Sequence, residues 1–291
     1  MSESHVLAAP PPGAAADWTV DQGWASYTAD DHRVWTTLYE RQTAMLPGRA
    51  CDAFLHGLDA LDLQRGGIPD FTRINPELTR LTGWSVVAVP GLVPDAVFFD
   101  HLANRRFPAG RFIRDGAHLD YLQEPDIFHD VFGHVPMLTD PVFADYMQAY
   151  GQGGLRAGRL DQLDHLARLY WYTVEFGLMR PPGGELRIYG AGIVSSRAES
   201  LFALEDPSPN RLGFDLERVM RTPYRIDDFQ QVYFVIPSLD ALLAATLQDF
   251  GPIYQRLSMA TDVGIEDVLP ADAVLTRGTQ AYAHSKAPSA P

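Results

Sequence analysis

Apolar side chains recur at intervals of three and four residues along most of the chain, the spacing that places them on one face of an α-helix. Phe54, Leu58 and Leu61 follow this pattern within residues 50–63, and Gly66 and Gly67 come soon after it. Because glycine favours helix ends, we predict a helix that stops before this pair. The same reasoning predicts further helices over residues 31–47, 75–83, 141–151, 160–179 and 238–257, and one that opens at Pro94.

Short runs with strand character interrupt these helices. Residues 84–89, 185–190 and 232–237 are rich in β-branched and aromatic side chains, as strands are. The prediction is therefore a mainly α fold with a few short β-strands. No linker or internal repeat divides the chain, so we expect one domain over residues 17–270. Residues 1–16 and 271–291 are expected to be flexible tails, because their alanine- and proline-rich ends bury little.

Composition narrows the class of protein. Hydrophobic residues make up 46% of the 291 residues, enough for a sizeable core, and the formal net charge is −14. A strongly acidic chain without a basic block is a poor candidate for binding nucleic acid or an anionic membrane. The single cysteine, Cys51, allows no intrachain disulfide. Since the N-terminus lacks the features of a signal peptide, we expect a cytoplasmic protein without membrane spans.

The stretch from Glu124 to Pro136 carries the strongest chemical signal. It contains His129 and His134 among apolar residues that favour burial, and buried imidazoles need polar partners or a metal. On a regular α-helix, residues five apart point roughly 140° away from each other. We therefore predict a short helix that ends at Gly133 and leaves His134 on the turn that follows. Either Asp126 caps the start of this helix or Pro125 is its first residue.

Glu175 is the candidate for a third ligand. It lies in an aromatic helical run, where an unpaired carboxylate would cost several kcal/mol. Two histidines and one carboxylate with open positions form the facial triad of non-haem Fe(II) oxygenases. Two alternatives stay open at this point: the histidines can be structural, and Glu175 can pair with Arg168 or Arg180.

Three segments in order give the chain a wider resemblance. They are "YLQEPDIFHDVFGHVP", "ARLYWYTVEFGL" and "RIYGAGIVSS". Together they resemble the pterin-dependent aromatic amino acid hydroxylases, above all the bacterial members that act on phenylalanine. The resemblance runs from about Trp18 to about Leu257. It implies a single helical-basket catalytic domain with the metal inside, which uses Fe(II), O₂ and tetrahydrobiopterin or a related tetrahydropterin to convert L-phenylalanine to L-tyrosine. Tryptophan and tyrosine are the alternative substrates.

The resemblance also implies roles for individual residues. His129, His134 and Glu175 match the metal ligands and the catalytic centre. Arg114 matches the position that binds the substrate carboxylate, and Asp126 is expected to orient it. Matches to the substrate pocket are Pro125, Trp171 and Phe176, with Tyr170 close by, and Ser195 and Ser196 match residues near the polar end of the substrate. Asp130 matches an acidic position near the pterin, and Gly91 and Leu92 are assigned to it because they can offer backbone hydrogen-bonding groups. Asn104 stands where animal members stack the pterin on a Phe, so we assign the stacking to Phe98. Gly190 and Gly192 are expected to serve a tight turn.

The three candidate ligands also allow other functions, and the length of the chain bears on its oligomeric state. A zinc-dependent hydrolase could use the same three ligands, although only Asp130 stands beside a histidine as a base. A third hypothesis is a non-enzymatic binding module with structural histidines, which would bind no metal. Animal members of the family carry a regulatory domain and a tetramerising helix, for which this chain has no room. We therefore expect a monomer whose partners are small molecules alone.

Overall fold

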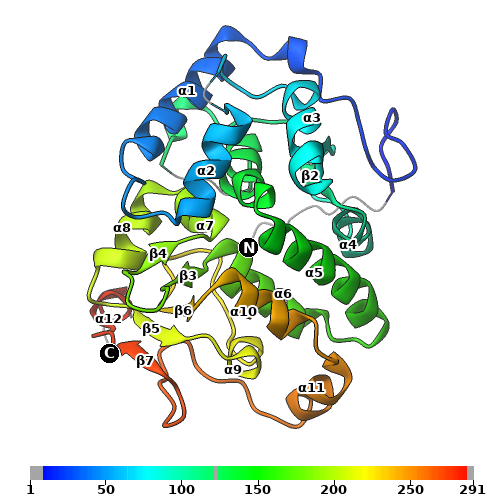
Figure 1. Cartoon of the computed structure of the whole chain (residues 1–291). Helices are drawn as coiled ribbons and strands as arrows, with labels where there is room; N and C mark the ends of the chain where they lie inside the picture. Colours follow the sequence, from blue (N-terminus) through cyan, green and yellow to red (C-terminus); the bar gives the residue numbers. More distant parts are fainter. Residues whose placement is uncertain (1–8, 64, 121–123, 287–291) are drawn as a thin grey trace. The chain divides into compact units, whose positions relative to one another are not determined.

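The structure is a computed structural model, and it describes residues 9–63, 65–120 and 124–286 (Figure 1). It divides into two compact units after Asp161. The first unit contains both histidines, and the second contains Glu175. Each unit is described by itself below.

Helices make up most of the first unit. Its α-helices are α1 (Ala29–Thr43), α2 (Asp52–Leu61), α3 (Phe71–Thr82), α4 (Asp95–Ala103) and α5 (Pro141–Arg159). Three short 3-10 helices are η1 (Trp24–Ser26), η2 (Gly116–His118) and η4 (Val135–Thr139), and a π-helix is η3 (Phe128–His134). Two strands, β1 (Ser85–Ala88) and β2 (Arg106–Ala109), pair in parallel.

The start of α3 differs from the prediction. Asp70 caps the helix and accepts the backbone N–H of Thr72 at 2.8 Å, so Pro76 lies inside the helix and not at its first position. Asn75, where the prediction began this helix, instead exchanges two hydrogen bonds with the backbone of Val86 in β1. An Asn followed by Pro is typical of a helix start, but here the amide is used to hold a strand against the helix.

The glycines of α5 also act differently from the prediction, which ended this helix near Gly151. A Cβ on Gly151 would lie 2.4 Å from the backbone nitrogen of Ala103, and one on Gly154 would lie 2.0 Å from the ring of Phe99. Both contacts are with α4, which packs along α5 (Figure 1). These glycines therefore permit close helix packing, and α5 continues through them to Arg159.

The second unit combines short helices with one sheet. Its helices are α6 (Leu163–Tyr170), the π-helix η5 (Trp171–Glu175), α7 (Ala191–Val194), α8 (Arg197–Glu205), α9 (Leu216–Met220), α10 (Leu239–Thr246), α11 (Phe250–Leu257) and α12 (Ala281–Lys286). Its strands are β3 (Leu178–Met179), β4 (Arg187–Ile188), β5 (Asn210–Gly213), β6 (Val232–Ile236) and β7 (Val274–Thr276). The sheet order is β4-β3-β6-β5-β7, and every residue of β6 is buried.

Three elements in this unit differ from the prediction. The single helix expected over residues 238–257 is divided into α10 and α11. The helix expected over residues 160–179 begins at Leu163 and ends at Glu175, because the chain then turns into β3. The segment expected to be a tail from residue 271 contains β7, which pairs with β5, and α12. Residues 287–291 and 1–8 of the expected tails lie outside the described residues, and residues 9–16 form turns that are mostly exposed.

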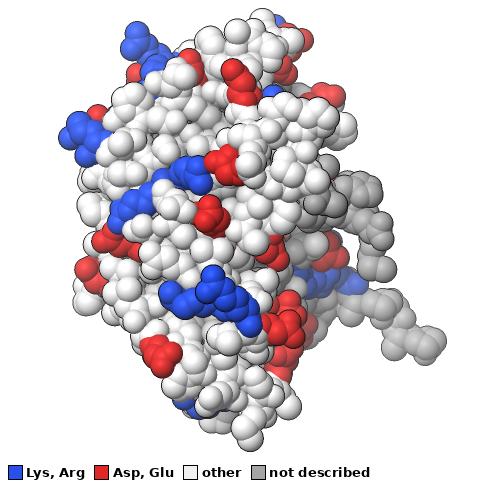
Figure 2. Space-filling model, turned by 90° about the vertical axis from the view of Figure 1, so that its right-hand side faces the viewer, with Lys and Arg blue, Asp and Glu red and all other residues white. Residues whose placement is uncertain are grey.

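The predicted fold class is confirmed, since helices dominate and the strands are few and short. Among the described residues, no helix is long and apolar enough to cross a membrane. The net charge is −14, and on the face drawn in Figure 2 the Lys and Arg side chains lie in separate groups with acidic side chains beside them.

Candidate metal centre

The two histidines lie on one π-helix, and this explains their spacing. Hydrogen bonds in a π-helix join residues five apart, so His129 and His134 project from the same side of η3. Their Nε2 atoms are 3.3 Å apart. The prediction that the helix ends at Gly133 was wrong, because Gly133 is buried within η3 and the wider turn itself brings the imidazoles together.

Aromatic packing fixes η3 in place. Phe128 and Phe132 stack on each other with ring centroids 4.6 Å apart and an interplanar angle of 11°. The edge of Trp35, from α1, meets Phe128, and that of Phe54, from α2, meets Phe132. All four side chains are fully buried. Tight packing on the far side of the helix leaves the histidine-bearing side little freedom to move.

Asp126 holds the start of this helix. Its carboxylate accepts the backbone N–H of His129 at 3.0 Å, which is the expected capping contact. The same carboxylate accepts two bonds from the guanidinium of Arg114, each 2.8 Å long. Burial alone would raise the pKa of Asp126, but the bonds and charge of Arg114, with the backbone N–H groups, outweigh it and lower that pKa. The carboxylate is therefore ionised at neutral pH.

Glu175 closes the second π-helix. The backbone N–H of Phe176 bonds to the carbonyl of Trp171, five residues earlier, at 2.8 Å. A Cβ on Gly190 would lie 2.4 Å from the carbonyl oxygen of Glu175, and one on Gly192 would lie 3.2 Å from it. The chain does turn here, since the N–H of Ile193 donates to the carbonyl of Gly190, but neither glycine has a positive φ, so the turn itself does not require glycine. They are needed because another chain segment passes directly beside the Glu175 backbone.

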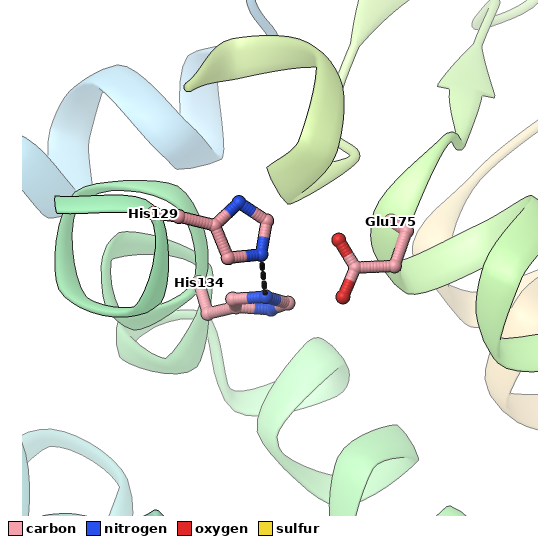
Figure 3. A group of neighbouring side chains, drawn as sticks. All are labelled: His129, His134 and Glu175. Atoms are coloured by element: carbon pink, nitrogen blue, oxygen red, sulfur yellow. Dashed lines mark hydrogen bonds between the residues drawn. The ribbon is translucent and has the colours of Figure 1, made fainter. Parts of the chain in front are cut away.

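The three predicted ligands form a group that could hold a metal ion. His129, His134 and Glu175 each offer one ligand atom, and these atoms all lie within 4.8 Å of one another (Figure 3). Two imidazole nitrogens and a carboxylate oxygen suit zinc or a first-row metal such as iron. Arg168, an alternative partner for Glu175, instead pairs with Asp262 at 2.6 Å.

Comparisons with known proteins decide the family. The profile of the biopterin-dependent aromatic amino acid hydroxylases matches residues 22–261. The chain belongs to this hydroxylase family. A curated relative of this hydroxylase, the phenylalanine-4-hydroxylase of Caulobacter vibrioides, is 75% identical over 283 residues, which cover 97% of this chain and 96% of the relative.

Solved structures agree with this assignment. The phenylalanine hydroxylase of Chromobacterium violaceum with bound oxidised Fe(III) is 57% identical to this hydroxylase and matches it with a TM-score of 0.87, over 90% of this chain and 94% of the other. The same bacterial protein with bound iron and phenylalanine gives a TM-score of 0.85 at 55% identity, over 90% and 95% of the two chains. The predicted family, enzyme class and biopterin dependence are confirmed.

The residues expected to hold the pterin lie in part at one end of the two-stranded sheet. Gly91 and Leu92 follow β1, and Gly110 follows β2. The Asp130 carboxylate accepts the backbone N–H of Gly110 at 2.7 Å. Phe98, on α4, is half-buried with its ring edge against Phe99. Asn104 ends α4, with its side-chain amide bonded to the Asp100 carbonyl. These contacts leave the assignment of all four pterin residues a prediction.

The residues expected to bind substrate differ in their surroundings. Pro125 is exposed, and Tyr170, Trp171 and Phe176 are half-buried. The Trp171 and Phe176 rings tilt against each other with centroids 4.8 Å apart. Both serine hydroxyls have partners within the chain: that of Ser195 donates to the carbonyl of Ala191, and that of Ser196 accepts the backbone N–H of Glu199. A ligand could therefore still accept a hydrogen bond from Ser196.

Two residues beside Trp171 were missed by the sequence analysis. Tyr224 stacks on the indole with centroids 4.4 Å apart, and Gln230 accepts the indole N–H at 2.9 Å. They lie in an irregular loop between α9 and β6, which matches no motif. A buried Trp needs an acceptor for its N–H, but sequence alone does not tell which of the polar residues provides it.

Proposed function

We propose that this enzyme hydroxylates the ring of L-phenylalanine to give L-tyrosine, at an Fe(II) held by His129, His134 and Glu175. The observation that carries the proposal is the grouping of these three ligands in a chain of the biopterin-dependent family. Further support comes from the Chromobacterium protein, a similar enzyme that has been solved with both iron and phenylalanine bound. The metal and the tetrahydropterin together supply the means to activate O₂.

In this proposal, the chain's own side chains bind and orient the amino acid. Arg114 takes the substrate carboxylate, because a guanidinium fork suits a carboxylate, and its pairing with Asp126 fixes the direction of the fork. Pro125, Tyr170, Trp171 and Phe176 provide flat apolar surfaces for the ring. Ser195 and Ser196 lie near the polar end of the substrate.

The tetrahydropterin is assigned to four residues. Gly91 and Leu92 would offer backbone hydrogen-bonding groups, Phe98 a stacking face and Asp130 an acceptor for ring N–H groups. Support for the acidic residue is that it follows the ligand His129 directly and is held in place by Gly110. Asp130→Ala should therefore raise the KM for the pterin several-fold more than the KM for phenylalanine.

Aerobic turnover tests the function directly. The enzyme, Fe(II), a tetrahydropterin and L-phenylalanine are mixed in air, and the tyrosine formed is counted against the pterin oxidised. Equal amounts are expected. Pterin oxidation without tyrosine would reject phenylalanine as the substrate and direct the same assay to tryptophan and tyrosine. Neither product from iron-loaded enzyme would overturn the proposal. The family match favours this function over a zinc hydrolase.

We further infer that the enzyme acts as a monomer in the cytoplasm, on small molecules alone. A single buried cysteine is consistent with a reducing compartment, and an acidic chain is poorly suited to nucleic acid. Light scattering after size-exclusion chromatography gives the mass in solution. A value near 32.3 kDa is expected, and a value near four times that mass would contradict the monomer.

A further inference from the structure

The loop of residues 222–231 surrounds the indole of Trp171. Tyr224 covers one face of the indole, with an interplanar angle of 14°, and Gln230 meets its N–H edge. The hydroxyl of Tyr172, the next residue along the π-helix, donates to the carbonyl of Pro223 at 2.6 Å. Three contacts from one loop therefore bind the first turn of the helix that ends in Glu175.

The amide of Gln230 has only one satisfactory orientation. Its Nε2 donates to the backbone carbonyls of Arg225 at 2.8 Å and Asp228 at 3.3 Å. Its Oε1 therefore faces the indole, which can only donate. A flipped amide would place an NH₂ group against the indole N–H and an oxygen against two carbonyls. Because Gln230 is 3% exposed, water cannot readily replace these partners.

The loop is itself held from behind. Phe229 stacks on Phe202 of α8 with centroids 4.5 Å apart and an interplanar angle of 13°. The hydroxyl of Tyr282, in α12, donates to the carboxylate of Asp228 at 2.6 Å. These contacts hold the loop in place, and they therefore also fix the position of the acceptor oxygen of Gln230.

We propose that Gln230 is a positioning residue that sets the plane of the Trp171 indole and so determines which aromatic ring the enzyme accepts. This inference rests on the proposed function, in which Trp171 and Phe176 are walls for the substrate ring. With Tyr224 and Gln230 in place, the indole cannot turn about its side-chain bonds, and its angle of 32° to the Phe176 ring is fixed. Without the acceptor, the indole can turn and admit a wider ring.

Gln230→Met tests the proposal, because methionine has a similar length but lacks a strong acceptor. Loss of one neutral hydrogen bond changes a binding constant by about fivefold. We expect kcat/KM for phenylalanine to fall about fivefold, mainly through KM, while that for tryptophan is maintained or rises. Tyr224→Leu removes the stacking face and should shift the ratio of the two substrates in the same direction, which provides a second test if Gln230→Met folds poorly.

Gln231→Met is the matched control. Gln231 is also 3% exposed, and its side-chain amide donates to the carbonyl of Phe229 at 2.9 Å. A similar loss of thermal stability is expected for both variants, but kcat/KM of the control should stay within about twofold of wild type. If Gln230→Met changes the phenylalanine-to-tryptophan ratio no more than this control does, the proposal is overturned.

A double-mutant cycle with Trp171→Phe tests whether Gln230 acts through the indole. The phenyl ring has no N–H, so Gln230→Met should have no further effect on the substrate ratio in that background. Additive effects of the two substitutions would overturn the proposal. An active wild type with additive effects rejects this inference alone, whereas a wild type that makes no tyrosine rejects the proposed function and this inference with it.

A spectroscopic measurement tests the hydrogen bond without turnover. The chain has five tryptophans, and Trp171→Phe identifies the indole N–H resonance of Trp171 in the ¹H–¹⁵N spectrum of the full chain loaded with diamagnetic Zn(II). In Gln230→Met this resonance should move upfield, and in Gln231→Met it should not. An unmoved resonance in Gln230→Met would overturn the proposal.

Discussion

The two π-helices that carry the three candidate ligands are held in different ways. Asp126, three residues before His129, caps η3, and the stack of Phe128 on Phe132 lies within η3 itself. By contrast, Pro223 and Gln230 hold the first turn of η5 from 51 and 59 residues further along the chain. The cap and the ring stack of η3 therefore come from its own stretch of sequence, with Trp35 and Phe54 packed against that stack from earlier helices. The contacts on the first turn of η5 come only from segments that reach it in the folded unit.

The largest effect should come from removing a ligand on either helix. His129→Ala, His134→Ala and Glu175→Gln should each lower iron content and tyrosine formation by at least about 100-fold, because even outer partners of a metal site are worth roughly 10–100-fold. Iron is measured by elemental analysis and tyrosine by chromatography. His165→Asn is the control, since His165 lies on the helix before Glu175 but outside the ligand group. Turnover near wild type in a ligand variant would refute the ligand assignment.

Asp126→Asn tests how far η3 depends on its cap. The Asp126 side chain is fully buried against Arg114, and removing one charge of a buried pair costs about 3–5 kcal/mol of unfolding free energy. Urea unfolding at neutral pH measures this loss. Glu77→Gln, which breaks an exposed pair with Arg80, is the control and should cost under about 1 kcal/mol.

The lowered pKa of Asp126 also fixes a pH dependence. The unfolded carboxyl titrates near 3.8, and the folded one titrates lower. The stabilisation is therefore fully present above pH 3.8 and is lost as the pH falls towards the folded-state pKa. This component should be missing from Asp126→Asn, so the free energies of the two proteins should converge in acid. A constant difference down to pH 2 would contradict the assignment.

Glu199, which contacts the loop that holds η5, should give the opposite dependence of stability on pH. Its carboxylate accepts the hydroxyl of Tyr233 at 2.5 Å and faces the backbone N–H of Gln230. Burial raises its pKa from 4.5 to about 7, despite these bonds. The folded state then favours the protonated form, so wild-type stability should fall between pH 4.5 and about 7 and level off above.

Glu199→Gln should remove this fall. At pH 8 the variant should gain stability on the order of 3 kcal/mol over wild type, the equivalent of that difference in pKa, and the gain should vanish near pH 4. Thermal unfolding across this pH range gives the difference. Glu205→Gln, at an exposed position on the same helix, should follow the wild type, and a flat difference for Glu199→Gln would refute the raised pKa.

The smallest effect tests the contact behind Glu175. In Gly190→Ala the new Cβ would overlap the Glu175 carbonyl, and such overpacking costs about 1–3 kcal/mol. Metal affinity should fall with stability, because the displaced backbone carries a ligand. Gly153→Ala is the control: a Cβ there meets nothing within 4 Å, so the helix should gain about 0.5–1 kcal/mol. Equal effects of the two substitutions would contradict this account of Gly190.

Patterns local in sequence predicted much of this structure. The helical class, the strands at β1, β4 and β6 and the Asp126 contact at the start of η3 follow from spacing and turn chemistry. The choice of three side chains that could hold a metal follows from residue type and composition. The errors have a common cause. Gly151 was taken as a helix end and Gly190 as a turn signal, but each is required by a neighbour that comes close only after folding.

The assumed pitch of the helix was a second source of error in the sequence-based prediction. A spacing of five residues was interpreted on an α-helix, and so demanded an end at Gly133; on a π-helix the same spacing needs none. Residue propensities do not distinguish a π-helix from an α-helix. The wider turn is selected by packing against its neighbours and by the side chains that it brings together. Gln230 was missed for a related reason, since an isolated polar residue in a loop gives no periodic signal.

Strand β7 has a practical consequence for handling the protein. The composition of the C-terminal segment favours removing everything after residue 270, yet β7 covers the outer edge of β5. The N–H of Gly278 donates to the side chain of Asn210, the first residue of β5, and the N–H of Gln280 donates to the carbonyl of Ser208 just before that strand. A shortened version would present bare strand hydrogen-bonding groups to its neighbours in solution. Such a version is a poor choice for crystallisation or expression, because open edges of this kind recruit other chains and precipitate.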